Sequence, residues 1–127
     1  MEDSFTLPKL LMGTPIVMNP SAQSTTLSQA HNLTNTPIFF VSYIECVIAE
    51  SGYVVGDRVF LDNNWPTTVS GYVISADSAN MYLTTPNSGP IQLISKTTPA
   101  GNIAGTTANW KIVAIPYALA SVPGEWI

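Results

Sequence analysis

The chain of 127 residues is long enough for one domain with a buried core. Its net charge is −4 and it has only four basic residues, which excludes the clustered Lys and Arg that nucleic-acid binding requires. Charged residues make up 9% of the chain, against about 25% in typical soluble domains. The weak self-repulsion of such a chain favours assembly with other proteins.

The first residues of the chain predict neither export nor membrane insertion. They begin with Glu2 and Asp3, where a secretory signal would have a basic segment followed by a long apolar stretch. No window reaches the roughly 18 consecutive apolar residues of a membrane span. We therefore expect synthesis in the cytoplasm and assembly inside the cell.

Residues 1–28 are interpreted as an N-terminal arm and linker. Three prolines exclude a long helix, while residues 16–18 could add as an edge strand to a neighbouring sheet. A run rich in Ser and Thr follows at residues 21–28 and is typical of a linker. The apolar candidates of the arm are Leu10, Leu11, Ile16 and Val17. Such an arm commonly becomes ordered when it docks on a partner.

Residues 29–115 are predicted to form the folded domain. The segment 38–49 places apolar side chains on both faces of an extended chain, which predicts a central strand. Further strands are expected at residues 58–61, 69–75, 80–85, 91–95 and 109–115. Because no 3.6-residue apolar period is found, the pattern predicts an all-β fold with very little helix. We expect an antiparallel β-sandwich or jelly-roll-like fold of about six to eight short strands with extended N- and C-terminal arms.

Residues 116–127 are interpreted as a C-terminal docking extension. Two prolines interrupt this segment, yet it keeps Tyr117, Leu119, Trp126 and Ile127. An aromatic residue so close to the end of the chain suits an anchor on another subunit. Folding back onto the same domain would bury the same apolar area, so both interpretations stay open.

The stretch HNLTNTPIFFVSYIEC, followed by GYVVGDRVFL and later by NWKIVAI, resembles a small bacteriophage protein module. This is the trimeric, H-type-lectin-like β-sandwich of phage fibre and head decoration proteins. The resemblance covers about residues 29–115. It rests on His31, Pro37, Cys46, Gly52, Tyr53, Gly56, Asp57, Asn109 and Trp110 in that order. What it implies is a trimeric sandwich on a virion, with no chemistry of its own.

The sequence predicts no catalytic, cofactor-binding or metal-binding residues. His31 is the only histidine, so we expect it to hold a turn by hydrogen bonds rather than to join a catalytic or metal constellation. The single cysteine, Cys46, excludes an intramolecular disulfide and lies in an apolar run typical of a buried thiol. Asp57 and Asp62 could flank a cleft as glycosidase pairs do, but each is better explained as a turn residue. A calcium site at residues 62–64 lacks the usual alternating ligand spacing. We therefore expect no enzymatic activity.

The first functional hypothesis is a virion structural protein, a capsid decoration or cement protein that stabilises the shell as a homotrimer. Its partners would be its own copies and a major capsid protein or another virion protein, with no nucleic acid, no membrane insertion and no cofactor. The interface candidates are Leu10, Leu11, Ile16, Val17, Trp65, Tyr117, Leu119, Trp126 and Ile127. The second hypothesis is the receptor-binding tip of a tail or head fibre. Its loops at residues 62–66 and 86–90 would then recognise a cell-surface glycan, with Trp65 as a contact.

Overall fold

A computed structural model describes residues 6–60, 71–99, 101 and 103–123 of the chain. These residues form an all-β fold of antiparallel strands, as predicted, with a single turn of 3-10 helix at Thr107–Asn109. The strands are β1 (Thr6–Met12), β2 (Ile16–Met18), β3 (Thr26–Ala30), β4 (Phe39–Cys46), β5 (Arg58–Val59), β6 (Val73–Ala76), β7 (Asn80–Thr84), β8 (Gln92–Leu93), β9 (Ile103–Ala104) and β10 (Trp110–Pro123). Within these ranges the chain has no helix of the length and apolarity that crossing a bilayer requires.

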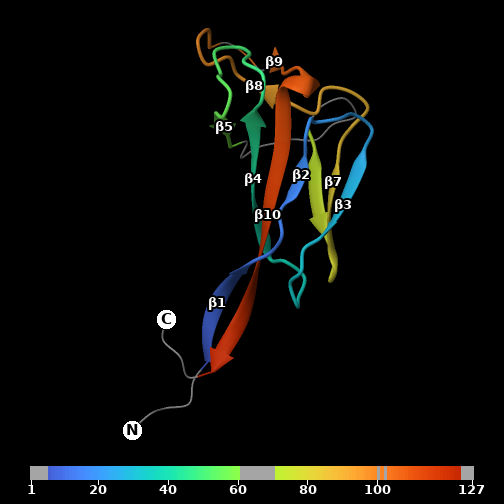
Figure 1. Cartoon of the computed structure of the whole chain (residues 1–127), viewed down its shortest axis with the longest axis vertical. Helices are drawn as coiled ribbons and strands as arrows, with labels where there is room; N and C mark the ends of the chain where they lie inside the picture. Colours follow the sequence, from blue (N-terminus) through green and yellow to red (C-terminus); the bar gives the residue numbers. More distant parts are fainter. Residues whose placement is uncertain (1–5, 61–70, 100, 102, 124–127) are drawn as a thin grey trace.

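Two sheets form the layers of a sandwich (Figure 1). The larger sheet has the order β1-β10-β4-β5, and β2 pairs with β10 as well. The smaller sheet has the order β3-β7-β6 and lies beside it. A separate pair, β8 and β9, lies at the end where β4 finishes and β10 begins.

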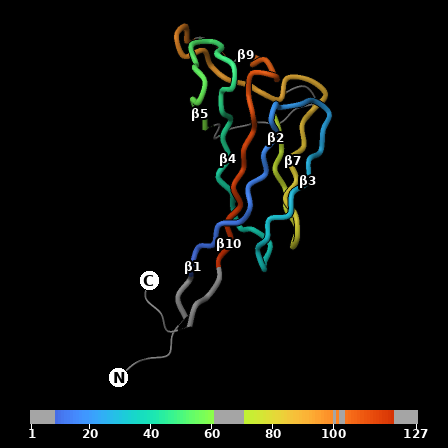
Figure 2. The backbone as a smooth tube through the Cα atoms, viewed as in Figure 1, coloured from blue at the N-terminus to red at the C-terminus, as the bar shows by residue number. Residues whose placement is uncertain are grey.

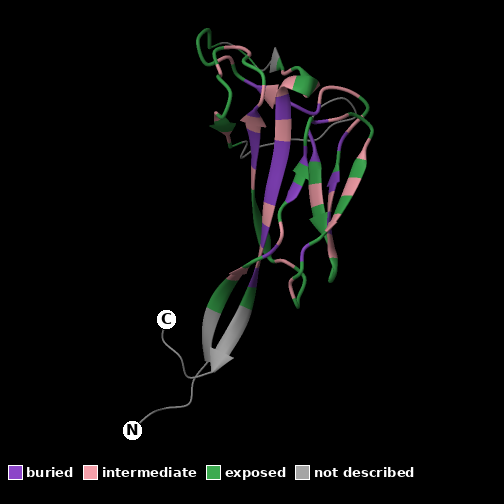
Figure 3. Ribbon diagram, in the orientation of Figure 1, coloured by how far each residue is buried: buried purple, intermediate pink, exposed green. Residues whose placement is uncertain are grey.

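Strand alternation places the core between the two sheets. Side chains along a strand point to opposite faces in turn, and every second residue from Trp110 to Ala114 of β10 belongs to the buried cluster. Ile44 of β4 packs there as well, and Met81 and Leu83 of β7 contribute from the smaller sheet. Figure 3 shows this burial along the upper half of β10.

Strand β10 is the longest element and organises the larger sheet. It was predicted to end at residue 115, because proline has no N–H to donate to a sheet. In the structure it continues through Pro116 to Pro123. The carbonyl of Pro116 still accepts a hydrogen bond from Gly13 N at 2.9 Å. The buried Pro116 therefore keeps the one backbone hydrogen bond that a proline can make, with a donor from the connection between β1 and β2.

The N-terminal residues belong to the sandwich itself, which differs from the expected arm and linker. Strand β1 pairs with β10 along its whole length, from Thr6↔Pro123 to Met12↔Tyr117. Strand β2 adds to the sheet of its own chain, not to a neighbouring sheet. Strand β3, in the run interpreted as a linker, forms an edge of the smaller sheet. The boundaries expected at residues 28 and 115 both fall inside strands.

The central part of the prediction is confirmed. Strand β4 lies between β10 and β5, as expected for a strand with two apolar faces. Strands β5, β6, β7 and β8 fall inside or within one residue of the segments expected to be extended. The two-residue strand β9 lies between the strands expected at residues 91–95 and 109–115, where no strand was expected.

Candidate interaction surface

The two ends of the chain form a ribbon that projects from the sandwich (Figures 1 and 2). We define the terminal ribbon as β1 together with residues 117–123 of β10, which form seven antiparallel residue pairs. Strand β4 pairs with β10 only as far as Phe39↔Tyr117, so it leaves the rest of the ribbon two-stranded. Isolated two-stranded ribbons are at best marginally stable in water. Covering the apolar side chains of the terminal ribbon would therefore stabilise it.

One face of the larger sheet points away from the smaller sheet and carries a continuous row of apolar side chains. Alternation places these side chains on the face opposite to the core between the sheets. Tyr43 and Val113 share this outer face but are buried. They are aligned by cross-strand pairs, such as Leu10↔Leu119 in the ribbon and Val41↔Ile115 farther up the sheet. We call this set the outer stripe: Leu10, Met12, Val17, Phe39, Val41, Ile115, Tyr117 and Leu119.

Most of the outer stripe is open to solvent. The exposed fractions are 50% for Leu10, 64% for Met12, 45% for Val17, 42% for Phe39, 37% for Val41 and 48% for Leu119. The rings of Phe39 and Tyr117 stack with centroids 5.1 Å apart and an angle of 12° between their planes. Antiparallel sheets with one face in solvent usually alternate apolar and polar side chains. Among the described residues of this face, Tyr43 and Val113 are buried, whereas the outer stripe is apolar and largely exposed.

A charged cluster bounds the outer stripe at the end of the sheet away from the ribbon. Glu45 accepts hydrogen bonds from Arg58 Nε at 3.0 Å and from Lys111 Nζ at 3.2 Å. Hydrogen bonds from Lys111 and Arg58 hold the pKa of Glu45 below its usual value. The guanidinium of Arg58 also lies 4.6 Å from the ring centroid of Tyr43. The carboxylate of this cluster is therefore already neutralised by two cations.

A small cavity of about 140 Å³ opens between the sheets near the base of the ribbon. It is lined by residues 37–40, where β4 begins, and by residues 74–76 and Met81 of the smaller sheet. Ile38 and Phe40 at its rim are 59% and 43% exposed. Apolar surface thus continues from the outer stripe around the edge of the sandwich.

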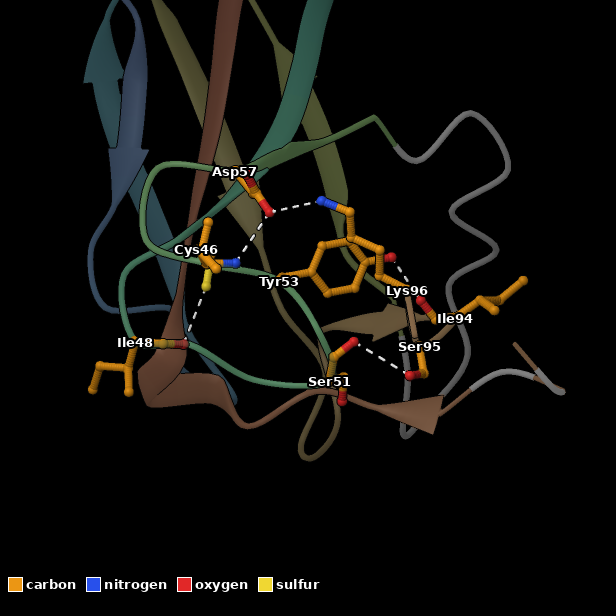
Figure 4. Close-up of polar contacts among 9 residues, drawn as sticks. Cys46, Ile48, Ser51, Tyr53, Asp57, Ile94, Ser95 and Lys96 are labelled. Carbon is orange, nitrogen blue, oxygen red and sulfur yellow. Dashed lines mark hydrogen bonds and ion pairs between the residues drawn. The ribbon is translucent and has the colours of Figure 1, made fainter. Parts of the chain in front are cut away.

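The opposite end of the molecule is held by the turn at residues 52–57 (Figure 4). Asp57 Oδ2 accepts a hydrogen bond from Val54 N at 3.0 Å and forms an ion pair with Lys96 Nζ at 3.3 Å. The bond from Val54, with Lys96, holds the pKa of Asp57 below its usual value. Tyr53 donates its hydroxyl to Ile94 O at 2.6 Å. Asp57 is therefore a turn-forming residue, as predicted from its position after a glycine.

Glu50 was not singled out in the sequence, yet it accepts three hydrogen bonds. Trp110 Nε1 donates to its Oε1 at 2.6 Å, and Thr106 donates through its N at 2.9 Å and its Oγ1 at 2.8 Å. Burial raises the pKa of Glu50, but the bonds from Trp110 and Thr106 outweigh it, and the net pKa lies below the usual value. No motif in the sequence marks the position of Glu50 between two short loops. Its role is to anchor Trp110.

His31 and Cys46 have the structural roles that the sequence predicts. His31 is fully buried; its Nδ1 accepts from Leu33 N at 3.0 Å and its Nε2 donates to Asp77 O at 2.9 Å. The imidazole therefore ties the end of β3 to the turn before β7. Cys46 is fully buried and donates to Ile48 O, and burial raises the pKa of its thiol.

The structure brings four of the interface candidates together on the outer stripe: Leu10, Val17, Tyr117 and Leu119. Leu11 alternates to the other side of β1 and is half-buried. Ile16 is fully buried in the core of its own chain, because β2 is part of the sheet, so it offers no free surface. Trp65, Trp126 and Ile127 lie outside the described residues, as do residues 62–66.

The other four stripe residues were missed: Met12, Phe39, Val41 and Ile115. The alternation in residues 38–46 does place Phe39 and Val41 on one face, but it cannot show whether that face is covered. The register between β1, β10 and β4 was needed to align them with both termini.

Comparisons with known proteins found no matching family, no matching curated protein and no matching solved structure. Among the described residues, no group of three or more His, Cys, Asp or Glu side chains could hold a metal ion. The functional conclusion therefore rests on the geometry of the surface, of which the outer stripe is the most unusual part.

Proposed function

We propose that this chain is a bacteriophage virion structural protein, a capsid decoration protein that stabilises the shell as a homotrimer. The observation that carries the proposal is the outer stripe, an uncharged apolar face that reaches from Val17 and Val41 to the terminal ribbon. A protein with this surface acts by burying it. The low charge of the chain supports the same role, because copies held close together repel one another little.

The size of the exposed surface fits a protein interface. Six stripe side chains between 37% and 64% exposed present together roughly 500 Å², near the upper limit for the largest apolar patch of a typical monomer. Covering that area contributes about 12 kcal/mol at 25 cal/mol per Å² before the cost of association is subtracted. This gross contribution is of the same order as the estimated association cost.

Two parts of the proposal, the location on a phage particle and the trimeric state, come from the resemblance of residues 29–115 to phage fibre and head decoration modules. The terminal ribbon supports a decoration protein in particular, because a projecting ribbon with apolar side chains can enter a seam between shell subunits. In this role the sandwich stays on the surface while the ribbon holds it down.

The test compares virus particles with and without the chain. Particles stripped of the protein should release their genome at a lower temperature, and adding the purified chain back should restore the original temperature. A Leu119→Lys variant should fail to restore it, whereas Val54→Lys, a change at a 59% exposed valine on the opposite end, should succeed. Stripped particles as heat-stable as intact ones would contradict the decoration role.

Glycan binding and the position of the chain on the particle distinguish the decoration role from the fibre-tip alternative. A receptor-binding tip would bind glycans on an array, and a Trp65→Ala variant would lose that binding. Such a result, with the chain found on a tail or head fibre, would replace the proposal of a shell-stabilising role.

A further inference from the structure

The occupant of the outer stripe can be inferred from the chemistry of the stripe. None of its eight residues is charged, and its only hydroxyl belongs to Tyr117. A complementary surface must therefore be equally apolar, because an unpaired charge buried against it would be costly. The outer stripe itself meets that requirement.

We propose that the outer stripe packs against the outer stripe of a second copy of this chain. The contact adds a layer to the sandwich, with two larger sheets face to face at about the 10 Å spacing of packed sheets. Two identical faces pair about a two-fold axis, so this contact joins two copies and does not by itself build the trimer of the proposed function. The inference rests on that function in one respect only, since it names the partner at the surface through which the function acts.

The buried area is sufficient for such a contact. Roughly 500 Å² from each copy gives about 1,000 Å², the lower bound for a specific interface between proteins. The stacked rings of Phe39 and Tyr117 lie in the row between the exposed Val41 and the exposed Leu119. Tyrosine is one of the residue types enriched among those that contribute most to interface energy.

Electrostatic repulsion between two copies across the stripe is weak, because no residue of the stripe is charged. The cluster at the far end of the stripe carries one carboxylate, Glu45, already paired with Arg58 and Lys111. With the net charge of the whole chain at −4, two copies face little long-range repulsion.

The first experiment measures the mass of the purified full-length chain by sedimentation velocity over a range of concentrations. The wild type should associate at micromolar concentration, and Val41→Lys should shift it to the monomer by at least a tenfold weaker association. Val54→Lys is the matched control, because it makes the same change at a more exposed valine on the opposite end. A monomeric wild type, or equal weakening by Val54→Lys, would overturn the inference.

A second experiment keeps the inference testable if Val41→Lys fails to fold. Val17→Cys places a thiol on the stripe of a chain whose single natural cysteine is fully buried. A short bis-maleimide should link two copies of this variant through the introduced thiols in high yield, and it should not link two copies of Val54→Cys. Equal yields from both variants, or none from Val17→Cys, would count against stripe-to-stripe packing.

These measurements need no virus particle, so they separate the inference from the proposed function. A chain that associates through the stripe but is absent from virions would leave the inference standing and remove the proposed role. A chain that is monomeric in solution yet stabilises particles would remove the inference and leave the proposed role standing.

Discussion

The indole N–H of Trp110 donates a 2.6 Å hydrogen bond to Oε1 of Glu50, sixty residues earlier in the chain. Trp110 is fully buried at the start of β10, and its ring meets that of Tyr53 edge to face with centroids 5.4 Å apart. This contact connects the longest strand to the loops at one end of the sandwich. It therefore holds the end opposite to the terminal ribbon.

Replacing Glu50 by alanine should lower the free energy of unfolding by about 1–3 kcal/mol, because the buried indole N–H loses its acceptor. Glu50→Gln keeps an acceptor oxygen and should cost less. Glu45→Ala is the control, since it breaks only partly exposed ion pairs that contribute at most about 1 kcal/mol. Urea denaturation gives the three values, and equal losses at both positions would contradict the anchoring role of Glu50.

Acid should destabilise the fold. The pKa values of Glu45, Glu50, Asp57 and Asp77 all lie below their usual values in the folded chain. Such groups stabilise the fold above their unfolded pKa, about 4.5 for glutamate, and this stabilisation is lost as the pH falls through the lowered folded values. The urea midpoint should therefore decrease as the pH falls from about 5 to about 3, the range in which carboxylates titrate. A midpoint that stays constant would refute the carboxylate contribution, and Glu50→Gln should show a shallower decrease.

Removing the imidazole of His31 should cost about 2–4 kcal/mol of unfolding free energy. His31→Ala leaves the N–H of Leu33 and the carbonyl of Asp77 without their partner and opens a cavity in a buried position. Gln29→Ala, at the less buried neighbouring position in β3, should change the unfolding free energy by less than about 0.5 kcal/mol. A similar loss from both substitutions in thermal or urea unfolding would argue against a special role for His31.

Two glycines offer a matched comparison of backbone strain. Gly52 and Gly56 both have positive φ, at +88° and +96°. A Cβ at Gly52 would lie 2.6 Å from Thr97 Cγ2 and 3.0 Å from Thr97 N, whereas a Cβ at Gly56 meets nothing within 4 Å. Gly56→Ala should therefore cost only the conformational penalty of about 1–2 kcal/mol, and Gly52→Ala should cost more. The reverse order in chemical denaturation would be inconsistent with this packing.

The thiol of Cys46 should be protected in the folded protein. It is fully buried, and burial raises its pKa, so little reactive thiolate is present at neutral pH. An aromatic disulfide reagent should react slowly with the native chain and at the rate of a free thiol in concentrated urea. Fast reaction under native conditions would mean that β4 opens locally.

The sequence allowed the centre of the fold to be predicted because local rules decide it. Residues 38–46 alternate with apolar groups on both faces, and this pattern corresponds to a strand with neighbours on both sides. The lone His31 and the buried Cys46 could also be assigned, because each had only one plausible chemical role. In these places the short-range pattern and the packing agree.

The pairing of the two termini could not be predicted, because it joins residues more than a hundred positions apart. Pro116 suggested that β10 ends early, and the Ser and Thr residues near β3 suggested a linker, although Thr is well suited to strands. In both places, pairing between strands distant in sequence outweighed the local preference of the residues. Half of the outer stripe was missed for the same reason, since its alignment depends on the register of β1, β10 and β4.

Imaging of an intact particle at residue resolution tests most directly whether the outer stripe is covered by protein. We predict that Leu10, Val41 and Leu119 each lie within van der Waals contact of another chain, with a second copy against Val41. If these side chains face open solvent on the particle, or if the chain is absent from it, the proposed structural role is contradicted.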